Sequence, residues 1–578
     1  MILLLSTSDT DLLSARASGA DFRLANPARV NAGAELDELL EGTDLVVVRI
    51  LGGRRAWEEG LDQLLAGTRP VVVLGGEQQP DAELMEHSTV PAGVCAEAHS
   101  YLAHGGAENL EQLHNFLNDT LLLTGHGFAP PAPAPDWGRL ERTRRNDEGP
   151  VVAVLYYRAH HMAGNTHFVE TLCSAIEDAG GRPEPLFSGS LRSPSPELLE
   201  ALEGVDALVV TMLAAGGSRP ATAAAGGDDE AWDIGKLAEL DVPILQGLGL
   251  TSSRAQWEAN DDGLSPMDAA TQVAVPEFDG RLITVPFSFK ENDSEGLPIY
   301  VPDAERAARV AGIAVKHARL RHTPVEQRKL ALMLSAYPTR HSRVGNAVGL
   351  DTPASAVALL QRLREHGYDI GPEQGEDAIP GVAEQDGDAL IHAMIAAGGQ
   401  DPEWLTEQQL SGNPVRVPAS RYREWYATLP QELRENVEQH WGPPPGEQFV
   451  DRSQDPEGEI VLAALRAGNV VLMIQPPRGF GENPIAIYHD PDLPPSHHYL
   501  AAYRWLSEDF GAHAMVHLGK HGNLEWLPGK SAGLAASCAP DAALGDLPLV
   551  YPFLVNDPGE GTQAKRRVHA TLDRKSVV

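Results

Sequence analysis

The stretch "AHAMVHLGKHGNLEWLPGK", Ala512 to Lys530, joins a short apolar run to a loop rich in glycine, histidine and lysine. The alternation in "AHAMVH" favours a β-strand, and Gly519 and Gly522 disfavour a helix beyond it. Parallel α/β sheets are built from such strand-and-loop units, and they bind their ligands at the carboxyl ends of the strands. The stretch therefore predicts an α/β fold with a functional loop after this strand.

Similar units recur along the chain. Short apolar runs end in Gly, Pro or Asp and precede longer amphipathic stretches, which is typical of parallel sheets with buried strands. We therefore predict an α/β fold with several Rossmann- or flavodoxin-like parallel-sheet domains in one chain. The predicted strands are "MILLL" (1–5), "DLVVVRI" (44–50), "RPVVVLGG" (69–76), "PVVAVLYY" (150–157), "DALVVTML" (206–213), "VPILQGL" (242–248), "KLALMLSAYP" (329–338), "NVVLMIQPP" (469–477) and "AHAMVHLG" (512–519).

The domain organisation follows from length and from one biased segment. A chain of 578 residues is too long for a single core. The segment "GFAPPAPAPDWGRLERTRRNDEGP" is proline-rich and then charged, so we interpret it as a linker without packed structure. We predict a first α/β domain at 1–126, this linker at 127–150, a second α/β domain at 151–322 and a third α/β region at 323–578. Because the last helix has no cap, we expect the third region to be incomplete.

Composition excludes several function classes. The chain has 45 Lys and Arg against 81 Asp and Glu, a net charge of −36 that repels nucleic acids and anionic membrane surfaces. Its three cysteines, Cys95, Cys173 and Cys538, are far apart and form neither a disulfide framework nor a zinc ribbon. The opening "MILLL" is too short for a signal peptide or a membrane span. We predict a cytoplasmic protein without a nucleic-acid partner or a membrane span.

A phosphate-binding interpretation of the loop fails. "LEWLPGKS", Leu524 to Ser531, matches only the end of the pattern G-x-x-x-x-G-K-[ST]. Leu524 replaces the first glycine, and Pro528 lacks the N–H that such a loop directs at phosphate. No other match occurs, so we predict that this chain has no P-loop.

Two interpretations of the histidines in this loop remain open. His517, His521 and Glu525 follow one another within nine residues at the end of the strand. Imidazole and carboxylate groups can bind a divalent ion or move protons near neutral pH. Alternatively, the three side chains only cap and hydrogen-bond a tight turn.

A second motif, "VNDPGEGTQAKRR", Val555 to Arg567, is rich in cations at its end. We expect a turn, an N-cap at Thr562 and a helix that opens with Lys565, Arg566 and Arg567. Free N–H groups at a helix start, together with three cations, attract carboxylate or phosphate. The alternative is a solvated basic face.

Taken together, these motifs resemble those of a known family. From about residue 150 to its end, the chain resembles the large subunit of CobN-type aerobic cobaltochelatases and the related H-type subunit of magnesium chelatases, whereas residues 1–130 resemble them loosely. Asp557, Gly559 and Gly561 favour the cobalt branch. The resemblance rests on "YYRAHHMAGNTHFVETL", "LSPMDAATQVAVPEFDGRLIT", "RVGNAVGLDTPASA", "YHDPDLPPSHHYL", "HLGKHGNLEWLPGK" and "YPFLVNDPGEGTQAKRR".

The resemblance implies an enzyme that inserts Co²⁺ into hydrogenobyrinic acid a,c-diamide, a corrinoid tetrapyrrole, during cobalamin biosynthesis. Two AAA+ partner subunits of the family hydrolyse ATP with Mg²⁺. Two alternatives stay open: an H-type magnesium chelatase subunit acting on protoporphyrin IX, and a non-catalytic tetrapyrrole carrier. Family members are about twice as long, so we expect this chain alone to bind tetrapyrrole weakly and insert no metal.

The resemblance also assigns roles to residues. Metal insertion strips protons from the ring and water from the metal, so it needs bases and transient ligands close together. We predict that Glu525, His517 and His521 are catalytic and bind the metal transiently. The predicted substrate-binding residues are Lys565, Arg566, Arg567, Lys520 and Asn523.

Overall fold

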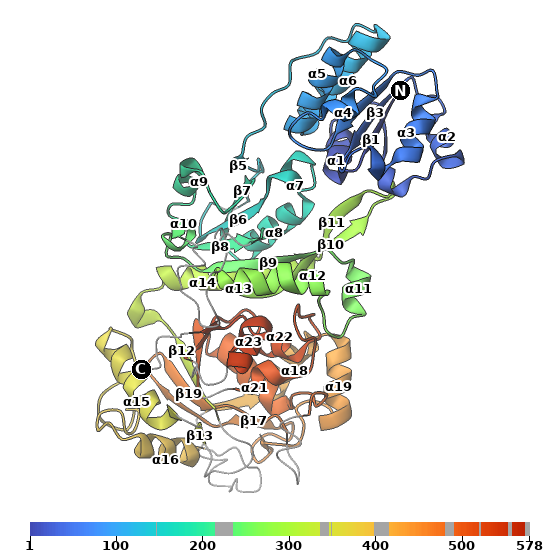
Figure 1. Cartoon of the computed structure of the whole chain (residues 1–578). Helices are drawn as coiled ribbons and strands as arrows, with labels where there is room; N and C mark the ends of the chain where they lie inside the picture. The colour runs from blue at the N-terminus through green and yellow to red at the C-terminus, as the bar shows by residue number, and fades with distance from the viewer. Residues whose placement is uncertain are drawn as a thin grey trace.

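The computed structural model of the chain describes residues 1–145, 147–213, 235–335, 346–347, 350–397, 415–479, 490–519, 522–552 and 558–572. Within these ranges the chain forms three largely parallel sheets of four, seven and six strands, together with two small antiparallel sheets. Figure 1 shows the three large sheets in chain order, from the N-terminal sheet at the top to the third at the bottom. The predicted α/β fold with several parallel sheets is confirmed.

All nine predicted strands are present. Their apolar side chains are buried on both faces, which is why a run of such residues was enough to locate them. Among the parallel strands that were missed are β7 (Arg182–Ser188) and β10 (Leu282–Asn292), in which prolines interrupt the apolar runs. The confirmed strands are β1 (Ile2–Ser6), β3 (Leu45–Ile50), β4 (Val71–Gly75), β6 (Val151–Tyr157), β8 (Ala207–Val210), β9 (Ile244–Leu250), β12 (Leu330–Leu334), β19 (Val470–Ile474) and β20 (Ala514–Leu518).

The first sheet has the order β2-β1-β3-β4, with β2 at Phe22–Ala25, and all of its strand pairs are parallel. Helices cover both faces, so the sheet separates two apolar clusters. On one face lie α1 (Asp9–Ala17), α5 (Ala92–His104) and α6 (Ala107–Leu117); on the other lie α2 (Ala34–Leu40) and α3 (Glu58–Leu65).

The second sheet has the order β11-β10-β9-β8-β6-β7-β5. Its edge strand β5 (Trp137–Arg139) pairs antiparallel with β7 and lies inside the segment predicted to be a linker without packed structure. That part of the prediction is wrong, because the three residues between the prolines and the charged run are free to form ladder hydrogen bonds. At the other edge, β10 and β11 (Pro298–Pro302) form a hairpin that reaches the first sheet, where Leu297 and Ile299 join its apolar cluster (Figure 1).

Helix α14 (Ala304–His322) connects the second sheet to the third. The Asp303 side chain caps it by accepting from the N–H of Arg306. One side of α14 packs with α8 (His167–Asp178) on the second sheet. In Figure 1 the helix runs beneath the second sheet and above the helices of the third. The remaining helices of this middle part are α7 (Arg158–Met162), α9 (Pro196–Ala201), α10 (Gly235–Ala238), α11 (Arg254–Glu258), α12 (Pro266–Asp268) and α13 (Val275–Phe278).

The third sheet has the order β18-β19-β12-β20-β21-β22, and only the edge pair β18–β19 is antiparallel. Helices pack on both of its faces. The carboxyl ends of β12, β19, β20 and β21 therefore meet along one edge. The elements added here are β18 (Ala464–Ala467), β21 (Leu549–Tyr551) and β22 (Thr571–Leu572), with α15 (Thr352–Glu365) and α16 (Gly387–Ala397) on one face and α21 (His497–Arg504), α22 (Ala539–Leu544) and α23 (Pro558–Arg567) on the other.

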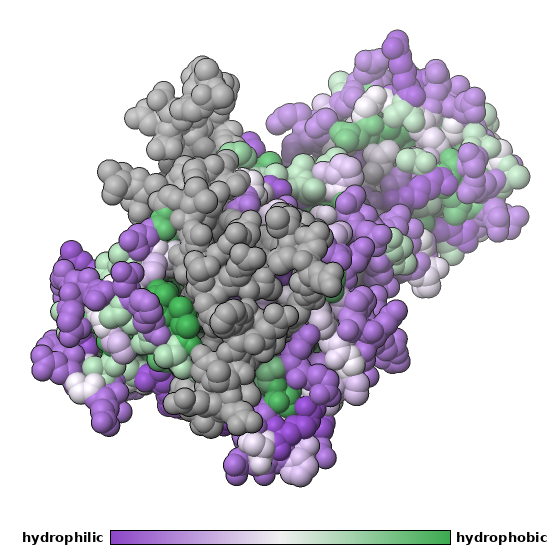
Figure 2. All heavy atoms as spheres, turned by 90° about the horizontal axis from the view of Figure 1, so that it is seen from below, coloured by the Kyte–Doolittle hydropathy of each residue, from purple (hydrophilic) through white to green (hydrophobic). Residues whose placement is uncertain are grey.

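A small antiparallel sheet of β15 (Val415–Pro418), β17 (Glu459–Leu462) and β16 (Val450–Asp451), together with α18 (Ala419–Ala427) and α19 (Gln431–Trp441), packs against α21. The face of the molecule seen from below is largely hydrophilic where it is described, in keeping with the charge of the chain (Figure 2). None of the described helices is long and apolar enough to cross a membrane.

Candidate functional site

His517 lies at the carboxyl end of β20, on the edge where the parallel strands of the third sheet end. Its ring is buried between two tyrosines, with centroid distances of 6.2 Å to Tyr503 and 5.5 Å to Tyr551. Nε2 lies 3.2 Å from the Tyr503 hydroxyl. Burial lowers the pKa of His517 to about 3 because the charged imidazolium loses its hydration. At neutral pH the ring is therefore uncharged.

Glu525 follows in the short 3₁₀ turn Leu524–Trp526 and is completely buried. Its Oε1 accepts from the N–H of Gly522 at 3.2 Å and from the Tyr551 hydroxyl at 3.4 Å. Its Oε2 has no hydrogen-bond partner in the part of the chain that the structure describes. Burial raises the pKa of Glu525 to about 7, although the bonds from Gly522 and Tyr551 partly offset this. The carboxyl group can thus gain or lose a proton near neutral pH.

Gly522 brings these groups together. A Cβ atom on Gly522 would lie 3.0 Å from His517 Nδ1, 3.2 Å from Glu525 Oε2 and 3.2 Å from the Tyr551 hydroxyl. The three polar groups therefore converge on Gly522, where a side chain would be crowded against all three, and we call this position the Gly522 space. The glycine three residues earlier has a different reason: a Cβ on Gly519 would lie 1.5 Å from Ser335 Oγ, so two loops approach each other there.

A network of uncharged groups holds this loop from behind. Asn523, a predicted substrate-binding residue, is buried and hydrogen-bonds to other residues of the protein. It accepts from the Tyr499 hydroxyl at 2.6 Å, donates Nδ2–H to the carbonyl of Pro476 at 3.2 Å and donates its main-chain N–H to Gln475 Oε1 at 3.2 Å. Gln475 Nε2 in turn donates to Tyr503 at 3.0 Å. Substrate binding by Asn523 stays a prediction, and its described contacts give it a structural role.

Sequence reasoning missed the other members of this network. Gln475, Tyr499, Tyr503 and Tyr551 come from elements far from the loop in sequence, and no motif contains them together with His517 and Glu525. Gln475 lies in the predicted strand at 469–477, and Tyr499 and Tyr551 lie in two of the quoted motifs, but these patterns do not place them beside His517.

Two predicted site residues, Lys520 and His521, lie outside the described residues. The metal site predicted for His517, His521 and Glu525 is therefore tested only in part. No group of three or more His, Cys, Asp or Glu side chains within the described ranges could hold a metal ion. His517 Nδ1 and Glu525 Oε2 both lie close to Gly522, so a divalent ion bound by these two atoms would take its other ligands from residues outside these ranges, from water or from substrate.

The predicted basic helix start is wrong. Helix α23 begins at Pro558, not at an N-cap on Thr562, because proline suits the first helical position and the chain accommodates Gly559 and Gly561 in the first turn. Lys565, Arg566 and Arg567 consequently lie in the last turn. There the cations complement the negative end of the helix dipole instead of adding to free N–H groups.

The two arginines of this turn bind protein groups. Arg567 is buried and donates to four main-chain carbonyls of the functional loop, those of Glu525, Leu527, Gly529 and Lys530. Arg566 makes a two-point ion pair with Glu277 of α13, at 2.9 and 2.7 Å. Lys565 is half-buried. Binding of substrate carboxylates by these cations stays a prediction, but the described contacts give Arg567 a role in shaping the loop.

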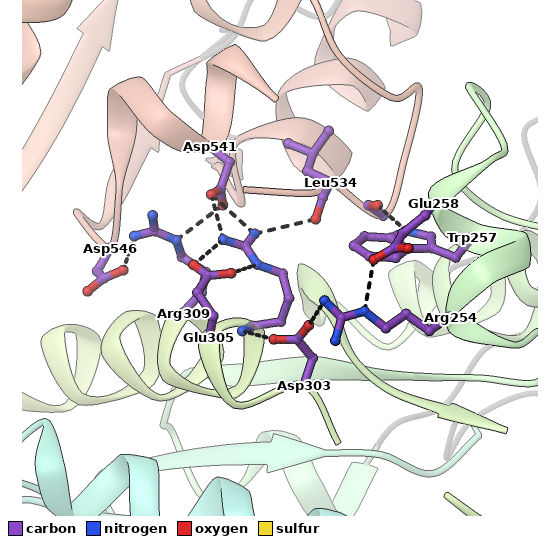
Figure 3. A network of polar contacts seen from close by, with 11 residues as sticks. Arg254, Trp257, Glu258, Asp303, Glu305, Arg309, Leu534, Asp541 and Asp546 are labelled. Carbon is purple, nitrogen blue, oxygen red and sulfur yellow. Dashed lines mark hydrogen bonds and ion pairs between the residues drawn. The ribbon is translucent and has the colours of Figure 1, made fainter. Parts of the chain in front are cut away.

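The segment after the loop is anchored to the second sheet by the polar network in Figure 3. Asp541 of α22 lies 3.2 Å from both Arg306 and Arg309 of α14, and Arg309 also pairs with Asp546. Trp257 of α11 donates its indole N–H to the carbonyl of Gly533 at 2.8 Å. These contacts fix residues 528–546 and hence the far end of the loop that carries Glu525.

Lys530 extends this anchor to α11. Its ammonium donates to the carbonyls of Glu258 at 3.1 Å and Asn260 at 2.7 Å. Beside it lies a cleft of about 810 Å³. Its lining includes residues of α11 and α14, which belong with the second sheet, and residues of α19 and 528–530, which belong with the third. Six carboxylates and three cations line it, so it disfavours an anionic ligand. The cleft does not include His517 or Glu525.

The described geometry defines a class of protein: a multidomain α/β protein with a buried imidazole and a buried carboxyl group, suited to proton transfer, at the carboxyl edge of a parallel sheet. Comparison with known proteins gives the family. The family model for CobN/Magnesium Chelatase matches residues 99–573, and the chain belongs to this family.

Individual relatives support the same family assignment. The chain is 36% identical over 607 residues to the aerobic cobaltochelatase subunit CobN of Pseudomonas aeruginosa, covering 99% of this chain and 46% of that protein. It is 31% identical to the H-type subunit of the magnesium chelatase of Chlorobaculum parvum, covering 74% of this chain and 31% of that protein. The chain thus spans about half the length, or less, of these relatives.

A solved structure of the catalytic subunit of cobaltochelatase from Mycobacterium tuberculosis superposes with a TM-score of 0.90. It is 65% identical in sequence and covers 99% of this chain, which in turn covers 47% of it. The cobaltochelatase matches cover nearly the whole chain and so include residues 1–130, whereas the family model begins at residue 99. All of the motifs that carried the resemblance lie beyond residue 150, so they contained no information on this first part.

Proposed function

We propose that the chain is the ring-binding and proton-handling part of the large subunit of an ATP-dependent cobaltochelatase. Its reaction is the insertion of Co²⁺ into hydrogenobyrinic acid a,c-diamide on the route to cobalamin. The cobaltochelatase relatives match nearly the whole chain at higher identity than the magnesium-chelatase relatives do, which supports cobalt. Asp557, Gly559 and Gly561 support the same branch.

The observation that carries this proposal is that Glu525 is a buried carboxyl group with a raised pKa. Insertion of a metal into a tetrapyrrole replaces the inner N–H protons of the ring, so a base must accept them. The carboxyl group of Glu525 has a pKa of about 7, and its Oε2 has no partner among the described residues. A group with this pKa is partly unprotonated at neutral pH and yet basic enough to keep a proton that it receives.

The other roles follow from the same arrangement. His517 and Tyr551 face the Gly522 space with Glu525 and handle protons or incoming Co²⁺ there. His521 and Lys520 belong to the same loop and keep their predicted roles in metal and substrate binding. As the family resemblance implies, two AAA+ partner subunits supply ATP hydrolysis with Mg²⁺, and the sequence of this chain, which has no P-loop pattern, agrees with this role. The ring binds at the carboxyl edge of the third sheet and not in the acidic cleft beside Lys530.

The test is a Glu525→Gln variant in a complete large subunit, assayed with both AAA+ subunits, ATP, Co²⁺ and the corrin ring. We expect turnover to fall at least 100-fold, as for loss of a general base, with ring affinity within about threefold of the wild type. Glu365→Gln, at an exposed carboxylate of α15, is the matched control and should turn over normally. Near-normal turnover of Glu525→Gln would contradict the proposal.

The same assay separates the alternatives. Insertion of Mg²⁺ into protoporphyrin IX, with no activity on cobalt and corrin, would assign an H-type magnesium chelatase subunit. Tight binding of either ring without any metal insertion by the wild type would assign a carrier.

A further inference from the structure

Gln475 and Tyr503 lie behind His517, on the side away from the Gly522 space, and neither has a role in the reaction proposed above. Both are buried, and they come from the end of β19 and from α21. We propose that they are positioning residues that hold neutral His517 with its proton on Nδ1, so that the ring presents an N–H donor, not a lone pair, to the Gly522 space. This inference rests on the proposed function and deepens it by naming which way His517 acts.

The main-chain N–H of Asn523 can only donate, and it lies 3.2 Å from the Gln475 side-chain oxygen. This fixes the amide of Gln475 with its oxygen toward Asn523 and its NH₂ group toward Tyr503. An amide NH₂ can only donate, so the Tyr503 oxygen accepts, and the single hydroxyl proton of Tyr503 must point elsewhere.

Two acceptors are within reach of that proton. His517 Nε2 lies at 3.2 Å and the Tyr499 oxygen at 3.5 Å. Tyr499 donates its own proton to the side-chain oxygen of Asn523 at 2.6 Å, because the Asn523 NH₂ group faces the carbonyl of Pro476. The imidazole nitrogen is nearer and is the stronger base, so Tyr503 donates to it.

Nε2 of His517 is therefore an acceptor. A neutral imidazole carries one proton, which must then be on Nδ1. Nδ1 lies 3.0 Å from the position of a Cβ on Gly522. The N–H of His517 thus points into the space that Glu525 Oε2 borders.

The consequence is chemical. In this tautomer His517 stabilises a hydrogen-bond acceptor in the Gly522 space, such as an ionised Glu525, a water molecule or a substrate carboxylate. It cannot bind a metal ion through Nδ1 until that proton leaves.

The test reads the protonated nitrogen directly and needs no turnover. The full chain is labelled with ¹⁵N-histidine, and the His517 ring signals are assigned by their loss in His517→Gln. Long-range ¹H–¹⁵N spectra at neutral pH should show a protonated Nδ1 and an unprotonated Nε2. A wild-type spectrum with the proton on Nε2 would overturn the proposal, whether or not any variant folds.

Two variants then test the cause. Tyr503→Phe removes the donor and should move part or all of the proton to Nε2. Tyr499→Phe removes a neighbouring buried hydroxyl that does not hydrogen-bond to His517, so it should leave the His517 signals unchanged. Identical spectra for wild type and folded Tyr503→Phe would show that Tyr503 does not set the tautomer. Because these spectra do not depend on metal insertion, failure here is distinguishable from failure of the proposed function.

Discussion

Arg567 donates a hydrogen bond to the main-chain carbonyl oxygen of Glu525. One side chain from the last turn of α23 therefore holds the backbone that carries the buried carboxyl group. The two residues belong to sequence motifs about forty positions apart, and this contact joins the motifs into one structural unit.

Replacing Arg567 should lower the stability of the loop, because this side chain donates to main-chain carbonyls of the loop. Arg567→Ala leaves four loop carbonyls without their donor, and we expect a loss of about 3 kcal/mol in the free energy of unfolding. Arg566→Ala removes a partly exposed ion pair and should cost about 1 kcal/mol or less. Denaturant unfolding measures both. Unchanged stability of Arg567→Ala with weakened ring binding would restore the substrate-binding role.

Asp541 should be the most sensitive residue of the network in Figure 3. Among the described residues, Asp541→Asn leaves Arg306 paired only with Glu305 and Arg309 paired only with Asp546, so we expect a loss of about 1–3 kcal/mol. Hydrogen exchange should rise in residues 528–546. Asp546→Asn changes a more exposed carboxylate and serves as the milder comparison. Equal exchange in both variants would show that the network does not anchor this segment.

Gly522→Ala should block the site while the chain still folds. The added methyl group would lie 3.0 Å from His517 Nδ1 and 3.2 Å from Glu525 Oε2, so it fills the space between them. We expect metal insertion by the complete enzyme to fall at least about tenfold, with a thermal midpoint within a few degrees of the wild type. Gly93→Ala, where an added Cβ meets nothing within 4 Å, is the control. Full activity of Gly522→Ala would mean that this space is not used.

Stability should fall in mild acid. Burial lowers the pKa values of His498 and His569 to about 4, whereas an unfolded chain has histidines with a pKa near 6.5. Below pH 6.5 the unfolded state therefore takes up protons that the folded state does not, and stability present above this pH is lost as pH falls toward 4. Each histidine contributes about 1.4 kcal/mol per pH unit in this window.

The check is unfolding at about pH 7, 6 and 5 for the wild type and for His498→Gln. Glutamine can keep the hydrogen bond that His498 Nε2 makes to the carbonyl of Val461, at 3.1 Å, but it does not titrate. The variant should lose less stability over this pH range than the wild type does. Parallel curves for the two proteins would contradict the assignment.

The strands of this fold were predictable because a buried parallel strand is a short run of apolar residues. The order of the strands was not, and the site depends on that order: β12 lies between β19 and β20, which places Gln475 behind the loop that follows His517. The pattern around His517 and Glu525 located the loop correctly. The tyrosines that complete it belong to α21 and β21, and no local spacing links them to the motif.

The errors have physical reasons as well. Glycines usually end helices, so "DPGEG" indicated a turn, but Pro558 at the first position and the packing of α23 against the loop outweigh that preference. The two histidines of "PPSHHYL" are structural: His497 hydrogen-bonds to Tyr422 and to the carbonyl of Gly442, and His498 hydrogen-bonds to the carbonyl of Val461. Neutral histidine is often a structural group in a core, and sequence alone does not distinguish this use from ligand binding.

Lys530 stands five residues after Glu525 and binds the end of α11 through two carbonyls. Arg566, on the other flank of the loop, binds α13 through Glu277. The loop with the buried carboxyl group is thus linked to the second sheet directly through Lys530 and indirectly through α23, which holds the loop by Arg567. A rotation of that sheet against the third would therefore pull on the backbone near Glu525.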